Sequence, residues 1–160
     1  MRLKMIGKPL RRVSFVFALL AAAPYAHAQA GYPKVAISSC VAGAASFHGV
    51  NPLILNAIIF HESRNNAQLI LKNRNGSVDV GLGGLNSIHF AELARYGIKP
   101  DHLLDGCVNT YVAAWLLAKQ VKANGNTWIA VGSYHSKTPE HRDRYAKQIY
   151  SVLRSWGAVQ

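Results

Sequence analysis

Acidic side chains are scarce in this sequence of 160 residues, which holds seven Asp and Glu against 18 Lys and Arg, a formal net charge of +11. So few carboxylates leave few candidates for acid–base chemistry, and each one that interrupts an apolar segment is informative. The basic residues are scattered, and no basic cluster or aromatic–basic module occurs, which argues against nucleic acid as a partner. An anionic polymer of a cell envelope, or a membrane surface, suits this charge better.

Motifs for binding metals and phosphates are also missing. His61 and Glu62 do not begin a zinc-protease helix, because that motif needs a second histidine where Asn65 stands. The remaining histidines show no compact ligand spacing, which favours surface or capping roles. No Gly-Lys-Ser or Gly-Lys-Thr follows the glycines of segment 76–84, so this segment does not form a phosphate loop. We therefore expect neither a metal nor a cofactor.

Residues 1–28 have the pattern of a signal peptide. A basic start is followed by a short apolar core over 13–23 and by Ala26-His27-Ala28, a typical cleavage site. The core is too short to span a bilayer, which needs about 20 residues; an uncleaved anchor is the alternative. Cleavage removes five of the 18 basic residues and none of the seven acidic ones, leaving a net charge of +6. We expect an exported chain with one domain over 29–160, no membrane span after cleavage and, by default, a monomer.

Only two cysteines occur, Cys40 and Cys107, and both lie in the expected exported part. Two cysteines in an oxidising compartment most simply form one disulfide. Their positions lie 67 residues apart, and a bond closing such a loop stabilises a fold by about 4 kcal/mol in the chain-entropy account. A catalytic thiol is the competing interpretation, and no strong histidine or asparagine context favours it.

Apolar periodicity predicts an all-α, mainly helical single domain. Asn51 as a cap with Pro52 at the first helical position marks one helix start, and Thr138-Pro139-Glu140 marks another. Glycines just beyond the apolar repeats mark helix ends. The expected helices cover 37–48, 52–63, 86–97, 107–124, 127–134 and 138–156.

The segment 64–85 breaks the helical pattern. It is rich in turn-forming asparagine and glycine, with hydrophobic residues between them. A connection of this length inside a small domain is either functional or disordered. Val78, Val80 and Leu82 alternate with other residues, which indicates a short strand or hairpin. We expect an irregular insert or a short β-hairpin directly after the second helix.

Glu62 is the most informative residue of the chain. It ends an apolar run and shares a helix face with Leu55, Ile58 and Ile59. A carboxylate carried into the core on such a stripe loses solvent, and desolvation raises its pKa. An acid with a raised pKa stays protonated near neutral pH and can donate its proton. The alternative is a solvated glutamate at a helix end.

Glycoside cleavage fits this acid best. Most glycosidases use two carboxylates, and the insert offers only Asp79 as a partner for Glu62, in surroundings that also suit a turn cap. One carboxylate is enough where a 2-acetamido group of the substrate stabilises the oxocarbenium-like centre. If the 6-hydroxyl of the same sugar then attacks, Glu62 acts first as acid and then as base. Such a reaction cleaves a glycan without water.

An ordered series of motifs runs from about Cys40 to Tyr150. In chain order they are Val50-Asn51-Pro52, Ile58, Glu62-Ser63, Asn75-Gly76-Ser77-Val78-Asp79-Val80-Gly81-Leu82, Asn86-Ser87-Ile88-His89-Phe90, Leu104-Asp105-Gly106-Cys107-Val108-Asn109, Ala114-Trp115-Leu116-Leu117-Ala118 and Val131-Gly132-Ser133-Tyr134-His135-Ser136. On these motifs the chain resembles the soluble lytic transglycosylase family. The resemblance is to the small exported members associated with type III and type IV secretion, conjugation and pilus systems.

The resemblance implies a lysozyme-like α-helical fold. It also implies cleavage of the β-1,4 bond between N-acetylmuramic acid and N-acetylglucosamine in peptidoglycan glycan strands, with a product that ends in 1,6-anhydro-N-acetylmuramic acid. A periplasmic location follows, where the protein would open the wall locally for a secretion system or a pilus. Components of that machine are further expected partners.

Site residues are carried over position by position. Glu62 matches the single catalytic acid/base of the family. Ser63 matches a supporting hydrogen-bond partner beside it, although a plain helix-end cap is the alternative. Tyr134 matches a tyrosine that lines the cleft near the glutamate, although a core aromatic residue is the alternative. The positions expected to contact substrate are Ser63, Gly81, Leu82, Asn86 and Tyr134.

One departure from the family pattern lies beside these positions. After Gly81-Leu82 the family usually has Met-Gln, and this chain has Gly83-Gly84. Two glycines remove the expected glutamine contact to sugar and are expected to loosen the backbone. They support a second hypothesis, a non-catalytic peptidoglycan-binding or assembly module. A third hypothesis is a hydrolase of lysozyme type, with Asp79 as its candidate base.

Overall fold

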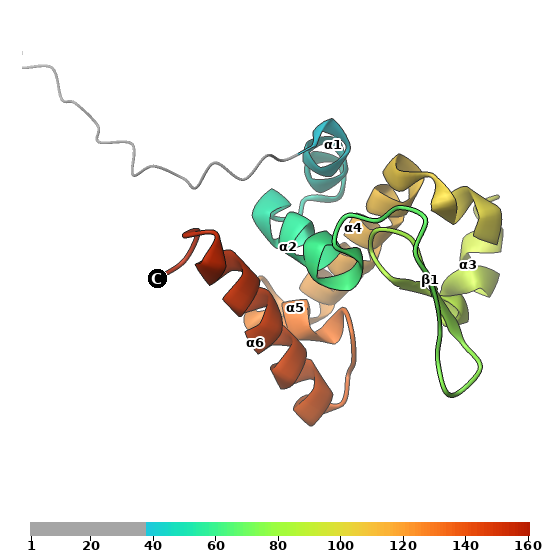
Figure 1. The fold of residues 1–160 in the computed structure, drawn as a ribbon. Helices are drawn as coiled ribbons and strands as arrows, with labels where there is room; N and C mark the ends of the chain where they lie inside the picture. Colours follow the sequence, from blue (N-terminus) through green and yellow to red (C-terminus); the bar gives the residue numbers. More distant parts are fainter. Residues whose placement is uncertain (1–37) are drawn as a thin grey trace, which may run out of the picture. The chain divides into compact units, whose positions relative to one another are not determined.

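The computed structural model describes residues 38–160. These residues form a mainly helical domain with a small antiparallel sheet, shown in Figure 1. The predicted fold class, a helical domain with a short β insert after the second helix, is confirmed. The predicted signal peptide, residues 1–28, lies outside the described residues.

Six α-helices, two 3-10 helices and three short strands make up this part of the chain. They are α1 (Ser39–His48), α2 (Pro52–Ser63), β1 (Ile70–Lys72), β2 (Val78–Val80), β3 (Leu85–Asn86), η1 (Ser87–His89), α3 (Phe90–Ala94), η2 (Pro100–Leu104), α4 (Gly106–Asn124), α5 (Trp128–Ser133) and α6 (Pro139–Ser155).

The helices begin where the local chemistry satisfies their free backbone N–H groups. The side chain of Asn51 accepts hydrogen bonds from the backbone N–H groups of Leu53 and Ile54, at the start of α2. At the start of α4, the side chain of Asp105 likewise accepts hydrogen bonds from backbone N–H groups, and Thr127 caps the start of α5. These contacts are local in sequence, which is why the predicted starts of α2 and α5 agree with the structure.

The core is built around α2, which packs against α1, α4 and α6. Leu55 and Ile58 of α2 are fully buried, as are Leu117 of α4 and Ile149 of α6. Burying one such side chain stabilises a fold by roughly 1.5–3 kcal/mol, so this contact region holds α2 in place. Its last turn carries Glu62, with α5 and α6 on one side and the β-hairpin on the other (Figure 1).

The insert after α2 is a three-stranded antiparallel sheet of order β1-β2-β3. The predicted alternation is confirmed for Val78 and Val80 of β2, whereas Leu82 lies in the turn that follows. Strand β3 was not predicted, because two residues are too few to show a period. In the sheet register Asp79 lies opposite Asn86, so the fold places the carboxylate of the insert beside an amide.

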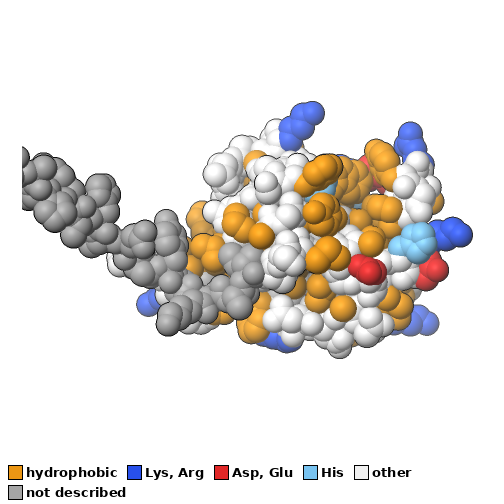
Figure 2. All heavy atoms as spheres, turned by 90° about the horizontal axis from the view of Figure 1, so that it is seen from above, with side chains coloured by type: hydrophobic (Ala, Val, Ile, Leu, Met, Phe, Trp, Pro, Cys, Tyr) orange, Lys and Arg blue, Asp and Glu red, His pale blue; other side chains and the backbone are white. Residues whose placement is uncertain are grey.

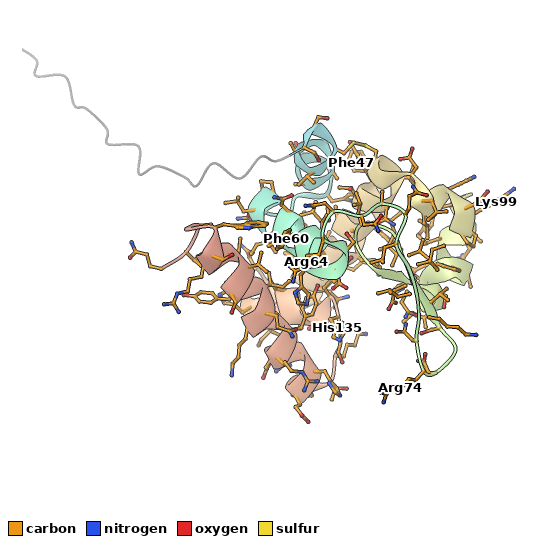
Figure 3. All side chains as sticks on the ribbon, in the orientation of Figure 1. Phe47, Phe60, Arg64, Arg74, Lys99 and His135 are labelled. Carbon is orange, nitrogen blue, oxygen red and sulfur yellow. A yellow bond between two sulfur atoms is a disulfide. The ribbon has the colours of Figure 1, made fainter. Side chains whose placement is uncertain are left out.

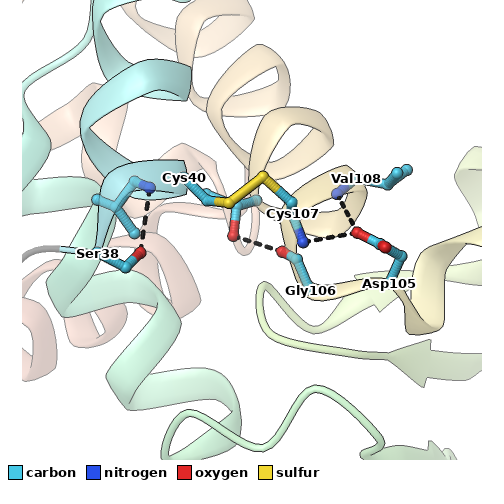
Figure 4. Close-up of a disulfide and its surroundings, with 8 residues drawn as sticks. Ser38, Cys40, Asp105, Gly106, Cys107 and Val108 are labelled. Atoms are coloured by element: carbon cyan, nitrogen blue, oxygen red, sulfur yellow. Dashed lines mark hydrogen bonds between the residues drawn. A yellow bond between two sulfur atoms is a disulfide. The ribbon is translucent and has the colours of Figure 1, made fainter.

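The predicted disulfide between Cys40 and Cys107 is present and joins the first turn of α1 to the first turn of α4 (Figure 4). Its Cα atoms lie 5.4 Å apart. Beside it, the carboxylate of Asp105 accepts hydrogen bonds from the N–H groups of Cys107 and Val108. The bond therefore connects two helix starts that the caps already order.

Within residues 38–160, no helix combines the length and the apolar character needed to cross a bilayer.

Replacing both Cys40 and Cys107 by serine is expected to lower the free energy of unfolding by about 4 kcal/mol, because the unfolded chain regains the freedom of a closed loop. The loop spans 67 residues. Guanidinium unfolding of the double variant and the wild type, each with and without reductant, measures this loss. Reductant should weaken the wild type and leave the variant unchanged. Equal stability of the two oxidised proteins would contradict this role of the disulfide.

Candidate active site

A cavity of about 500 Å³ opens beside the last turn of α2. One wall is the β-hairpin, and the other is formed by Tyr134 and His135, the two residues that follow α5. Figure 3 shows Arg74 at the hairpin and His135 on the opposite side, and both line the cavity. The lining residues are Glu62, Asn73, Arg74, Asn75, Ser77, Asp79, Gly84, Leu85, Asn86, Ile88, His89, Leu116, Tyr134 and His135.

Glu62 reaches this cavity from the end of α2. One carboxylate oxygen, Oε1, accepts a hydrogen bond of 2.5 Å from the hydroxyl of Tyr145. Burial raises the pKa of Glu62 from 4.5 to about 7, the charge of Asp79 adds to this rise, and the Tyr145 hydrogen bond opposes it. A pKa near neutrality allows one carboxyl group both to give and to take a proton at the same pH.

The rings around Tyr145 hold its hydroxyl against Glu62. Tyr145 lies on α6 and is 3% exposed. The ring of His135 stacks on it with a centroid distance of 4.9 Å, and the ring of His61 meets it edge-on at 5.2 Å. Tyr134 stacks beside it at 6.4 Å. Because its ring is held on several sides, Tyr145 acts as a fixed donor.

The sequence alone gave Tyr145 no chemical role. In the structure it lies on the buried face of α6. The missed signal was the hydroxyl, because a buried tyrosine O–H needs a hydrogen-bond partner. With seven acidic residues in the chain, Glu62 was one of few acceptors that carry charge.

None of the ion pairs within residues 38–160 includes Glu62. Burial lowers the pKa of His61, and the charges of Arg64 and His135 lower it further. Burial also lowers the pKa of His135, and it raises the pKa of Tyr145 well above its usual value. At pH 7 the nearest rings are therefore neutral, which favours the protonated form of Glu62.

Asp79 lies on the same cavity, in strand β2 and not in a turn. Its Oδ1 accepts a hydrogen bond of 2.6 Å from Asn86, and its Oδ2 accepts one of 2.9 Å from Asn73. Ser77 joins this polar group, since its hydroxyl oxygen accepts from both amides. Asp79 is therefore fixed by the sheet and lines the same cavity as Glu62.

The loop 81–84 is held firmly, so the loosened backbone expected from its glycines is not found. The N–H of Gly83 donates to Asn109 Oδ1 at 2.7 Å, and the carbonyl of Gly83 accepts from the hydroxyl of Tyr134 at 2.7 Å. Asn109 is completely buried, and its amide donates to the carbonyls of Val80 and Leu103. Sequence reasoning gave Asn109 no role, although a buried amide in an apolar helix requires partners.

The cavity brings together only part of the predicted site. Glu62, Asn86 and Tyr134 line it. Ser63 is buried and its hydroxyl donates to the carbonyl of Ile59, and Leu82 lines a different cavity beside Trp156. Gly81 does not line the cavity beside Glu62 either. The roles in substrate binding that the resemblance assigned to these positions stay predictions.

A second, larger cavity of about 670 Å³ lies between α1, α3 and α4. Figure 2 shows the face on which its hydrophobic side chains gather. It holds no carboxylate, so it offers no acid for glycoside cleavage. The lining residues are Phe47, His48, Leu93, Tyr96, Ile98, Cys107, Val108, Tyr111, Val112 and Trp115. In the part of the chain that the structure describes, no group of three or more His, Cys, Asp or Glu is arranged to hold a metal ion.

The sequence of the domain matches that of a known family. Residues 39–151 match the family described as Transglycosylase SLT domain. The X polypeptide of Escherichia coli is 40% identical over 110 residues, which cover 64% of this chain and 65% of that relative. The chain thus aligns with about 65% of the length of this relative.

Two further relatives cover more of both chains. Invasion protein IagB of Salmonella typhimurium is 36% identical over 126 residues, covering 76% of this chain and 79% of the relative. Protein IpgF of Shigella flexneri is 30% identical over 123 residues, covering 74% and 81%. The mainly helical fold with its small sheet is the lysozyme-like fold that the resemblance implied. The chain belongs to the transglycosylase SLT domain family.

Proposed function

We propose that this protein is a peptidoglycan lytic transglycosylase. It cleaves the β-1,4 bond between N-acetylmuramic acid and N-acetylglucosamine and leaves a 1,6-anhydro-N-acetylmuramic acid end. The observation that carries the proposal is the position of Glu62, a partly buried acid with a pKa of about 7 on the wall of an open cavity. Membership of the family supports the choice of substrate.

The reaction needs one proton to leave Glu62 and one to return. In the first step protonated Glu62 gives its proton to the bridging oxygen, and the bond from this oxygen to C1 of the muramic sugar breaks. N-Acetylglucosamine leaves with a free 4-hydroxyl group. The 2-acetamido oxygen of the substrate stabilises the positive charge at C1.

In the second step the 6-hydroxyl oxygen of the same muramic sugar bonds to C1, and the carboxylate of Glu62 takes the hydroxyl proton. The acid is restored and no water is consumed. Tyr145 keeps the carboxylate oriented through both steps, because it donates to Oε1. We further propose that the carboxylate of Asp79 stabilises the positive charge that develops on the sugar.

The proposed place of action is the periplasm. The predicted signal peptide supports export, and the disulfide suits an oxidising compartment. We propose that the protein opens peptidoglycan locally for a secretion system or a pilus and meets components of that machine. The name invasion protein, carried by IagB, supports a role in such a setting.

Glu62→Gln is expected to abolish the release of anhydro-muropeptides from purified sacculi, at least about 100-fold, because it removes the transferable proton and keeps the shape. Mass spectrometry of the digest measures the products. Gln120→Glu, on the far end of α4, serves as a control that changes one charge outside the cavity lining. Release of anhydro products at the wild-type rate by Glu62→Gln would contradict the assigned role of Glu62.

The same variant should change how stability depends on pH. The folded pKa of Glu62 lies near 7 against 4.5 for an ordinary glutamate, so ionisation opposes folding. The stability of the wild type is therefore full below about pH 4.5 and falls as the pH rises through about 7. Glu62→Gln should lack this loss and gain about 3 kcal/mol over the wild type between pH 4 and 8. Parallel urea titrations measure this gain, and a constant difference across the range would contradict it.

Tyr145→Phe should lower the rate about tenfold, because the carboxylate loses its fixed orientation. It should also raise the pKa of Glu62, since the lost hydrogen bond opposes that rise. The high-pH limb of the rate profile should therefore move to higher pH. Tyr150→Phe is the matched control, because this tyrosine lies on the same helix and its hydroxyl donates to the C-terminal Gln160. Identical profiles for the two variants would count against Tyr145.

Hydrolysis of lysozyme type is the second candidate, and the position of Asp79 favours it. Asp79 lies on the same cavity as Glu62 and contributes to its raised pKa. A hydrolase adds water and leaves reducing ends, whereas the proposed reaction leaves anhydro ends. The digest described above separates the two reactions. Binding to sacculi with no product of either kind would instead identify a non-catalytic peptidoglycan-binding module.

A further inference from the structure

We propose that Gly84 is a positioning residue for Glu62: the carboxylate occupies the space that a side chain at position 84 would need. The inference rests on the proposed function for its consequence in catalysis, and on geometry alone for the contact. It gives a role to the glycine pair that replaces the usual Met-Gln of the family.

The contact between Gly84 and Glu62 is direct. A Cβ atom on Gly84 would lie 2.7 Å from Oε2 of Glu62, and 3.2 Å from both its Cβ and its Cδ. These three nearest atoms all belong to Glu62. A separation of 2.7 Å is well inside van der Waals contact, so either the loop or the glutamate would have to move.

The loop has little room to retreat. Gly83, the preceding residue, is held on both sides of its peptide group, by Asn109 at its N–H and by Tyr134 at its carbonyl. Gly81 lies against the amide of Asn109 so closely that a Cβ there would be 2.1 Å from Nδ2. Asn109 is fully buried, and its amide group is hydrogen-bonded. It therefore holds the loop backbone beside Gly84 in place.

The glutamate is held as well. Its other oxygen, Oε1, accepts the hydrogen bond of Tyr145, whose ring contacts those of His135 and His61. A side chain at position 84 would therefore push Oε2 away from the loop and disturb the bond at Oε1. Glycine is the residue that this placement of the acid requires at position 84.

The test compares Gly84→Ala with Gly97→Ala. Both glycines have a left-handed backbone, with φ of +58° and +75°. A Cβ on Gly97 would meet no atom within 4 Å. Alanine therefore introduces a similar backbone strain at both positions, and only at position 84 does it introduce a contact with the acid. Two readouts are needed, release of anhydro-muropeptides from sacculi and an NMR titration of the Glu62 carboxyl carbon.

Gly97→Ala should keep the rate of product release within about twofold of the wild type and leave the Glu62 pKa unchanged, since it changes only loop strain. Gly84→Ala should lower the rate at pH 7 by about 10- to 100-fold, as expected for a misplaced catalytic group. The Glu62 pKa should move away from about 7, because a displaced carboxyl group changes both its burial and its hydrogen bond to Tyr145. Gly84→Gln, which supplies the residue usual in the family, should lower the rate too. The inference is overturned if Gly84→Ala matches Gly97→Ala in rate, or if its Glu62 pKa equals the wild-type value.

A double-mutant cycle covers the case in which Gly84→Ala folds poorly. Glu62→Ala removes Oε2 and Cδ, two of the three atoms that the new Cβ would meet, and keeps only the Cβ at 3.2 Å. In a Glu62→Ala background, Gly84→Ala should therefore destabilise the protein clearly less than it does in the wild-type background. An undiminished loss would overturn the inference.

Failure of the proposed function is distinguishable from failure of this inference. If the wild-type protein releases no anhydro products, the proposed function is wrong. The titration and the cycle still decide whether Gly84 positions Glu62.

Discussion

The hydrogen bond between Tyr145 and Glu62 is the contact on which the site depends. It joins two helices, α2 and α6, whose packing places a carboxyl group at the edge of the core. Desolvation at this edge favours the protonated acid, while the tyrosine hydroxyl limits that effect and fixes the direction of the carboxylate. A single group can then act as acid and as base, which is what a reaction without water requires of it.

The β insert supplies the opposite wall, and the buried Asn109 links it to the helical core. This amide holds the backbone at Val80, Leu103 and Gly83, and so sets how near the glycine loop comes to the acid. The sheet in turn fixes Asp79 through Asn86. Helix packing, loop and sheet therefore meet at one carboxyl group, which explains why a small domain needs an irregular segment directly after α2.

The sequence predicted those features that depend on near neighbours. Asn51 and Pro52 define the start of α2, and the apolar stripe ending at Glu62 defines its buried face, because both are properties of one helix. Tyr145 lies 83 positions from its partner, and Asn109 lies 26 from Gly83. Neither pairing leaves a periodic signal, because it arises only when separate elements pack. The glycine pair was expected to loosen the backbone because the hydrogen bonds that hold Gly83 come from Asn109 and Tyr134, which lie far from it in the sequence.

The central claim is that the fold keeps Glu62 protonated near neutral pH. The direct measurement is a ¹³C NMR titration of its carboxyl carbon in the wild-type protein, assigned by comparison with Glu62→Gln. The account predicts a midpoint near pH 7. A midpoint near 4.5, the value of an ordinary glutamate, would show a solvated carboxylate and contradict the account.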